Sequence, residues 1–170
     1  MKHVIAILSF LTLTSISNLY AQNETVASSQ TRILNTYFEV KNALVAGNSN
    51  LVALKCKELE TDINTLPIEK MGNDEKDLWL TYEKEIESNI KHMYETNDIA
   101  IQRKNFIDLS EGMYKIVKSL KTNSNTVYQQ YCPMKKAAWL SEVPDIKNPY
   151  YGKQMLTCGK TIEKIAPRSK

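Results

Sequence analysis

Four stretches of the chain carry apolar residues three or four positions apart, which is the spacing of an amphipathic helix. They run from Ile33 to Gly47, from Asn48 to Leu66, from Asn73 to Met93 and from Asp98 to Leu120. Each stretch is bounded by residue types that cap or end helices. Helices of this length with short connections predict a mainly α fold, an antiparallel four-helix bundle.

The pattern changes after Lys121, where β-prone residues and prolines replace the helical spacing. Residues 126–131 favour a strand, residues 137–140 favour a second short strand, and two prolines further on indicate turns. We therefore expect a β-hairpin or loop cap on the helical bundle, beginning at about residue 122.

The first residues have the composition of a secretory signal peptide, with a short basic start, an apolar run and a cleavage site at Ala21. The apolar run is too short to span a bilayer, so no transmembrane segment is expected in the mature chain. The sequence predicts a signal peptide over residues 1–21, a disordered leader over residues 22–29 and a single domain over residues 30–166. A periplasmic or secreted, soluble protein is expected.

The charge is nearly balanced, with 22 basic and 19 acidic residues and a net charge of +3. This balance gives no electrostatic reason to expect nucleic-acid binding. Catalytic motifs are weak: no Ser-His-Asp arrangement is supported by spacing, and there is no Gly-rich phosphate loop. Cys132 and His92 would suit a hydrolase, but Pro133 removes an N–H that an oxyanion hole would use. An enzyme is not expected.

The residues with the most distinctive chemistry are Cys132, Met134, Met155 and Cys158, which bracket an aromatic, Pro-containing segment. Thiolates and thioethers form a soft ligand set that favours monovalent copper. In an extended segment Cys132 and Met134 project to one face, and Met155 and Cys158 share a face if their segment forms a helical turn. The third cysteine, Cys56, lies on the apolar seam of the second helical stretch and is expected to pack as a small hydrophobe.

The same residues allow a second interpretation, in which Cys132 and Cys158 form a disulfide and both methionines pack in the core. Spacing alone leaves the two interpretations open. His92 is a candidate additional ligand because imidazole binds copper and zinc, although a lone exposed histidine is more often inert.

The second half of the chain contains many residues in a distinctive order. These residues are Asp98-Ile99, Gln102-Arg103, Phe106, Leu109-Ser110, Met113-Tyr114, Val117-Lys118, Thr126-Val127-Tyr128, Gln130-Tyr131-Cys132-Pro133-Met134, Trp139-Leu140-Ser141-Glu142, Asn148-Pro149-Tyr150, Gly152 and Met155-Leu156-Thr157-Cys158-Gly159. In them the chain resembles the domain-of-unknown-function 3347 family of exported bacterial domains. Its members stand alone or are fused to periplasmic adaptor subunits of heavy-metal efflux pumps.

This resemblance implies periplasmic handling of copper, silver or a similar metal, with an efflux adaptor or pump as the expected partner. Some relatives have a histidine at the position of His92. The resemblance favours a Cu(I) site, with Ag(I) or Zn(II) as other candidate ions. Cys132 and Cys158 would be the principal ligands, with Met134 and Met155 supporting them. The alternative remains a metal-free, disulfide-stapled interaction module that docks onto an envelope or efflux partner.

Overall fold

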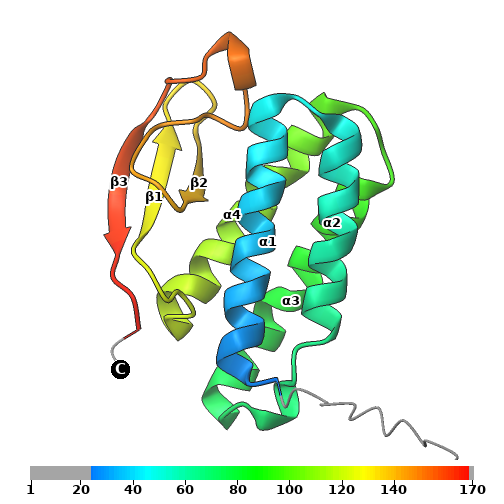
Figure 1. The fold of residues 1–170 in the computed structure, drawn as a ribbon, viewed down its shortest axis with the longest axis vertical. Helices are drawn as coiled ribbons and strands as arrows, with labels where there is room; N and C mark the ends of the chain where they lie inside the picture. The colour runs from blue at the N-terminus through cyan, green and yellow to red at the C-terminus, as the bar shows by residue number, and fades with distance from the viewer. Residues whose placement is uncertain (1–23, 169–170) are drawn as a thin grey trace, which may run out of the picture.

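The computed structural model describes residues 24–168, so the predicted signal peptide lies outside the described residues. Within that part of the chain, four α-helices precede a small three-stranded sheet (Figure 1). The elements are α1 (Val26–Ala46), α2 (Ser49–Asn64), η1 (Ile68–Lys70), α3 (Asn73–Tyr94), α4 (Ile99–Leu120), β1 (Val127–Cys132), β2 (Ala137–Ser141), η2 (Gly152–Gln154) and β3 (Lys160–Ile165), where η marks a short 3-10 helix. No helix in residues 24–168 is long and apolar enough to cross a membrane.

The mainly helical class is confirmed, and the helix ends show how the sequence specifies it. Gly47 ends α1 in the left-handed conformation (φ 73°) and donates its N–H to carbonyls of the last turn. The Asn48 side chain accepts a hydrogen bond from the Leu51 N–H at 3.0 Å, which caps α2. The Asp98 side chain caps α4 in the same way, accepting from the Ala100 N–H at 2.8 Å.

One boundary differs from the sequence prediction. Helix α1 begins at Val26, so residues 26–29, which were assigned to a disordered leader, are helical. Thr25 and Ser28 form a reciprocal capping box at this end, and Ser29 is fully buried. Small polar residues resemble a leader in composition, but here they supply a cap and a close packing contact.

The four helices lie side by side and enclose an apolar core, and the sheet lies next to α1 and α4 (Figure 1). The core residues follow the predicted helical spacing. Those that are at most 1 % exposed and lie in helices are Tyr37, Val40, Leu44, Val52, Cys56, Leu59, Trp79, Ile86, Ile90, Met93, Phe106, Leu109, Met113, Ile116 and Val117. Burial of this apolar surface is the main source of stability for the helical part.

The C-terminal sheet has the order β2-β1-β3, with β1 antiparallel to both neighbours. Strands β1 and β2 form the predicted hairpin, but β3 adds a third strand, so the predicted cap of a hairpin alone is corrected. In β3 only Ile165 is buried, and exposed or half-buried residues, three of them charged, occupy the other positions. A charged edge strand of this kind has a weak hydrophobic signal.

Aromatic and polar contacts fix the sheet against the helices. The Tyr37 hydroxyl hydrogen-bonds to the Ser110 hydroxyl at 2.8 Å and accepts a hydrogen bond from the Leu140 N–H of β2 at 3.0 Å. The Tyr37 ring stacks on Phe106 at 5.4 Å. Tyr150, from the loop after β2, contacts the Phe106 ring at 6.0 Å. These contacts hold the loop that carries the candidate site in a fixed place relative to α1 and α4.

Candidate metal centre

The structure brings the two C-terminal cysteines together, with their sulfur atoms 3.4 Å apart and no bond between them. Cys132 is the last residue of β1, and Cys158 lies two residues before β3. Antiparallel pairing of these strands sets Tyr131 opposite Lys160. Cys132 follows Tyr131 and Cys158 shortly precedes Lys160, so the two cysteines meet. The gap exceeds the ~2.05 Å of a disulfide. It falls short of the ~3.8 Å expected for two 2.3 Å bonds at a tetrahedral metal ion. The sulfur–sulfur distance therefore lies between the values of the two arrangements.

The turn between β1 and β2 wraps around the Cys132 sulfur. Residues 133–136 form this turn, which is closed by a 2.8 Å hydrogen bond from the Lys136 N–H to the Cys132 carbonyl. The Lys135 N–H points at the Cys132 sulfur from 3.4 Å. Backbone N–H groups directed at a sulfur stabilise its thiolate form and tune a bound metal.

Asn148 holds the segment that carries Cys158. Its buried side-chain amide donates to the Cys158 carbonyl at 2.7 Å, and its side-chain oxygen accepts from the Tyr150 N–H at 2.8 Å. Its backbone N–H donates to the Leu156 carbonyl at 2.8 Å. Asn148 belongs to the Asn-Pro-Tyr string noted in the sequence, yet its positioning role was not predicted, because its partners are backbone groups with no sequence signature.

Gly159 allows the Cys158 segment to approach the sheet. Its φ is +154°, and an added Cβ would lie 2.9 Å from the Trp139 ring and 3.1 Å from the Tyr131 carbonyl. Any larger residue would displace either this ring or the segment itself. The glycine after Cys158 is therefore part of what sets the sulfur–sulfur distance.

The two thiols differ in their electrostatics. Burial raises the pKa of Cys132, but hydrogen bonds from the Lys135 N–H, from the Cys158 thiol and from Asn148 outweigh it, and the net pKa lies below the usual range. The pKa of Cys158 is raised, mainly because its thiol hydrogen-bonds to the Cys132 sulfur. Cys132 therefore ionises first, and a soft cation held between the sulfurs would have to displace the proton of Cys158.

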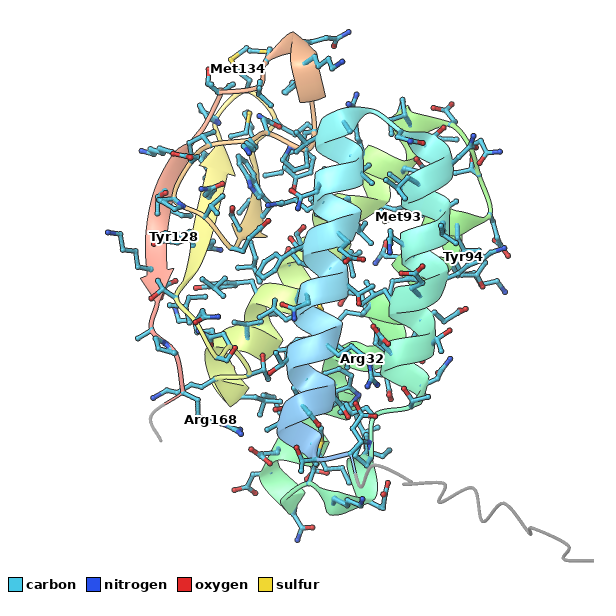
Figure 2. All side chains as sticks on the ribbon, viewed as in Figure 1. Arg32, Met93, Tyr94, Tyr128, Met134 and Arg168 are labelled. Atoms are coloured by element: carbon cyan, nitrogen blue, oxygen red, sulfur yellow. The ribbon has the colours of Figure 1, made fainter. Side chains whose placement is uncertain are left out.

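Both methionines lie in the segments that carry the cysteines. Met134 is in the turn after Cys132 and is 65 % exposed; it lies at the end of the molecule where the hairpin turns (Figure 2). Met155 is half-buried, and its carbonyl accepts the Cys158 N–H at 3.1 Å. Neither methionine is buried in the helical core.

His92 is placed elsewhere. It lies on an exposed side of α3, one residue before the buried Met93, and Figure 2 shows Met93 among the helices and apart from Met134. Helical geometry separates adjacent residues by about 100°, so burial of Met93 turns His92 outward. Across residues 24–168, no three or more His, Cys, Asp or Glu side chains gather into a metal-binding group. The donor atoms that the structure brings together are therefore the two thiols.

Cys56 is separate from this centre. It is fully buried in α2, and burial raises the pKa of its thiol to about 12. A buried thiol in apolar surroundings is a poor ligand and a poor nucleophile. Its environment agrees with the predicted role as a small hydrophobe.

Fold and centre together define a small, mainly helical domain whose C-terminal sheet carries a pair of adjacent free thiols. The sequence model described as "Protein of unknown function (DUF3347)" matches residues 33–125, and the chain belongs to this family. The match covers most of the helical part and ends before β1, so the cysteine pair lies beyond the matched residues. Searches of curated proteins and of solved structures found no match.

Proposed function

We propose that this protein binds one soft monovalent metal ion, Cu(I) or Ag(I), between Cys132 and Cys158. The observation that carries the proposal is the pair of unbridged sulfurs 3.4 Å apart, one of which receives a backbone N–H. Metal binding requires deprotonated thiols, and the lowered pKa of Cys132 supplies the first thiolate. The protein acts as a carrier or buffer and does not catalyse a reaction.

The donor set favours monovalent ions over Zn(II). Structural zinc sites use four N or S ligands. Within residues 24–168, the two thiols have no third His, Cys, Asp or Glu side chain beside them. Soft thioethers such as Met134 and Met155 add affinity for Cu(I) and little for zinc. In this proposal the methionines support the cysteines and His92 takes no part. Zn(II) binds more weakly than Cu(I) or Ag(I).

The cellular setting follows from the sequence resemblance. We infer that residues 1–21 direct the chain to the periplasm and that the metal ion passes to or from a heavy-metal efflux adaptor or pump. The helices serve as an antiparallel bundle that supports the cap and its thiols. Cysteines held by a soft metal ion would also be protected from oxidation in this compartment.

The test is titration of the fully reduced protein with Cu(I). The wild type is expected to saturate at one equivalent, and Cys132→Ser should abolish binding while the far-UV circular dichroism of the helices is retained. Cys56→Ser is the matched control because it removes a buried thiol outside the centre and should leave the stoichiometry unchanged. A reduced wild type that takes up no Cu(I) contradicts the proposal.

A second variant tests the thioethers. Replacing Met134 and Met155 together with Leu keeps the side-chain volumes similar. The double variant should bind Cu(I) more weakly by at least tenfold, with a much smaller change for Zn(II). Equal weakening for both ions would show that the methionines act through folding and not through coordination.

The alternative function is a disulfide-stapled interaction module, since the same two thiols lie side by side. On the chain-entropy model, a Cys132–Cys158 bridge would stabilise the fold by ~3.5 kcal/mol. Thiol counting on protein purified from the periplasm separates the two functions. Three free thiols support the metal carrier, whereas one free thiol supports the stapled module.

A further inference from the structure

We propose that the lysines around the cysteine pair form a docking surface for an acidic protein partner that exchanges the metal ion. This surface, called the basic rim, consists of Lys135, Lys136, Lys153 and Lys160. The inference rests on the proposed function, since it assigns the chemical character of the partner that gives or receives the ion.

Backbone contacts place each rim lysine near the thiols. Lys135 and Lys136 belong to the turn that encloses Cys132, and their own N–H groups contact its sulfur and its carbonyl. Lys160 is opposite Tyr131 in the β1–β3 ladder, beside Cys132. Lys153 is in η2, two residues before the carbonyl that accepts the Cys158 N–H. The rim therefore comes from three separate segments that converge on one site.

The rim lysines carry uncompensated charge. Within residues 24–168, none of the four forms an ion pair, whereas Lys41, Lys55, Lys115 and Lys118 each pair with a glutamate. The two glutamates of the cap, Glu142 and Glu163, are already engaged with other residues. Glu142 pairs with Lys41 at 2.5 Å, and Glu163 accepts hydrogen bonds from Tyr114 and Lys118. Positive potential at this end of the molecule is left for an external anionic group.

Apolar side chains lie among these lysines. Met134 is 65 % exposed and Leu156 is 38 % exposed. Leu156 also lines a hollow of about 430 Å³, together with Val45, Ala46, the two lysines Lys147 and Lys153, and Glu142, which is paired with Lys41. Apolar contacts surrounded by charged groups are the composition of a transient protein–protein interface. This hollow gives a partner side chain a place to enter beside Lys153 and Leu156.

The metal chemistry selects an acidic partner. Cu(I) bound by two thiolates has a net charge of −1, so surrounding lysines stabilise the loaded site and attract a partner site of the same kind. Complementary charge steers such encounters and raises association rates by 10–10³-fold. An anionic membrane would also be attracted by lysines, but metal exchange requires donor atoms that reach the sulfurs inside the rim. Protein ligands satisfy this requirement.

The test measures Cu(I) transfer from two synthetic peptides by stopped-flow spectroscopy. Both carry a Cys-x-x-Cys site loaded with Cu(I); one is flanked by glutamates and the other by glutamines. Transfer from the glutamate peptide to the wild type should be at least tenfold faster at low ionic strength. The advantage should disappear near 1 M salt, where the Debye length is about 3 Å.

Charge-reversal variants test whether the preference for the glutamate peptide comes from the basic rim. The rim variant combines Lys136→Glu, Lys153→Glu and Lys160→Glu, three exposed positions. The matched control combines Lys70→Glu, Lys84→Glu and Lys104→Glu, which are also exposed and lie outside any ion pair among the described residues. Both variants change the net charge equally. The rim variant should lose the preference for the glutamate peptide, and the control should keep it.

Equilibrium Cu(I) titration of all three proteins separates the two proposals. Absence of Cu(I) binding by the wild type overturns the proposed function and the docking surface with it. One equivalent in every protein, with equal transfer rates from both peptides, overturns only the docking surface. Binding of the wild type to phosphatidylglycerol vesicles without a preference for the glutamate peptide also overturns it, because the rim would then recognise lipid.

Discussion

The helical part and the C-terminal cap are stabilised by different interactions. Between α1 and α4 the buried positions are mostly apolar and recur with the helical period. In the cap, fully buried positions include the polar residues Gln130 and Asn148. The Gln130 amide donates to the carbonyls of Val143 and Pro144, both at 3.1 Å, and so fixes the loop after β2. Directional hydrogen bonds fix the positions of the cap's segments more tightly than apolar burial would. The distance between the two thiols depends on those positions.

The cysteines show the same difference at the level of single atoms. Cys56 has only apolar burial, which raises its pKa to about 12. Cys132 is also fully buried, and burial raises its pKa, but hydrogen bonds from the Lys135 N–H, the Cys158 thiol and Asn148 outweigh burial and the net pKa is lowered. Burial alone therefore makes a thiol inert, whereas hydrogen-bond donors directed at a buried sulfur stabilise its thiolate.

The largest expected effect comes from removing Asn148. Asn148→Leu leaves the Cys158 carbonyl and the Tyr150 N–H without their partners in a buried place, and unsatisfied groups cost about 1–3 kcal/mol each. We expect the free energy of unfolding to fall by roughly 3 kcal/mol in urea denaturation. The thiols of the cap should also react faster with a small alkylating reagent.

The matched control for that variant lies in the helical part. Gln102 is fully buried and donates its side-chain amide to the carbonyls of Ser49 and Thr96. Gln102→Leu should lower stability by a similar amount but leave the reactivity of the cap thiols unchanged. If both variants alter thiol reactivity equally, the cap is not specified independently of the helices.

A smaller effect is expected at the contact between the two parts, where the buried Lys41 of α1 pairs with Glu142 after β2. Glu142→Gln leaves the Lys41 ammonium buried without a counter-charge. Breaking a fully buried pair costs 3–5 kcal/mol; since the Glu142 side chain is 35 % exposed, we expect about 2–3 kcal/mol. The double variant with Lys41→Met should recover most of this loss, because it removes the uncompensated charge.

The same pair predicts a pH dependence. Burial raises the pKa of Glu142, but the hydrogen bond from Lys41 outweighs it, and the net pKa is lowered. A lowered folded-state pKa gives stability that is complete above the ordinary glutamate value of about 4.3 and is lost as the pH falls through the folded value. Acid denaturation of Glu142→Gln should lack this step. An unchanged acid transition would show that the pair makes no net contribution.

These contrasts explain how much could be predicted from the sequence. The helical spacing of apolar residues and the capping residues predicted the helices, because both signals are local in the sequence. Strand β3 was missed because a charged edge strand buries almost nothing beyond Ile165. The pairing of Cys132 with Cys158 was predicted as a possibility from residue type, but the Asn148 contacts depend on backbone groups brought together only by folding. His92 is a candidate on its chemistry alone, and the helical register of α3 leaves it on an exposed side of that helix.

The smallest expected effect tests whether Cys56 belongs only to the helical part. Cys56→Ala should lower the free energy of unfolding by roughly 1–2 kcal/mol at neutral pH, because it removes a buried sulfur. The raised pKa of Cys56 also predicts that wild-type stability declines as the pH rises from the ordinary cysteine value of about 8.5 towards 12. In Cys56→Ala this alkaline decline should be flatter, and urea denaturation at a series of pH values measures it. Cu(I) stoichiometry should stay at one equivalent, since Cys56 lies in α2, outside the cap that holds the paired thiols. Loss of that equivalent, or an alkaline decline identical to that of the wild type, would show that the buried thiol and the cap thiols are not independent.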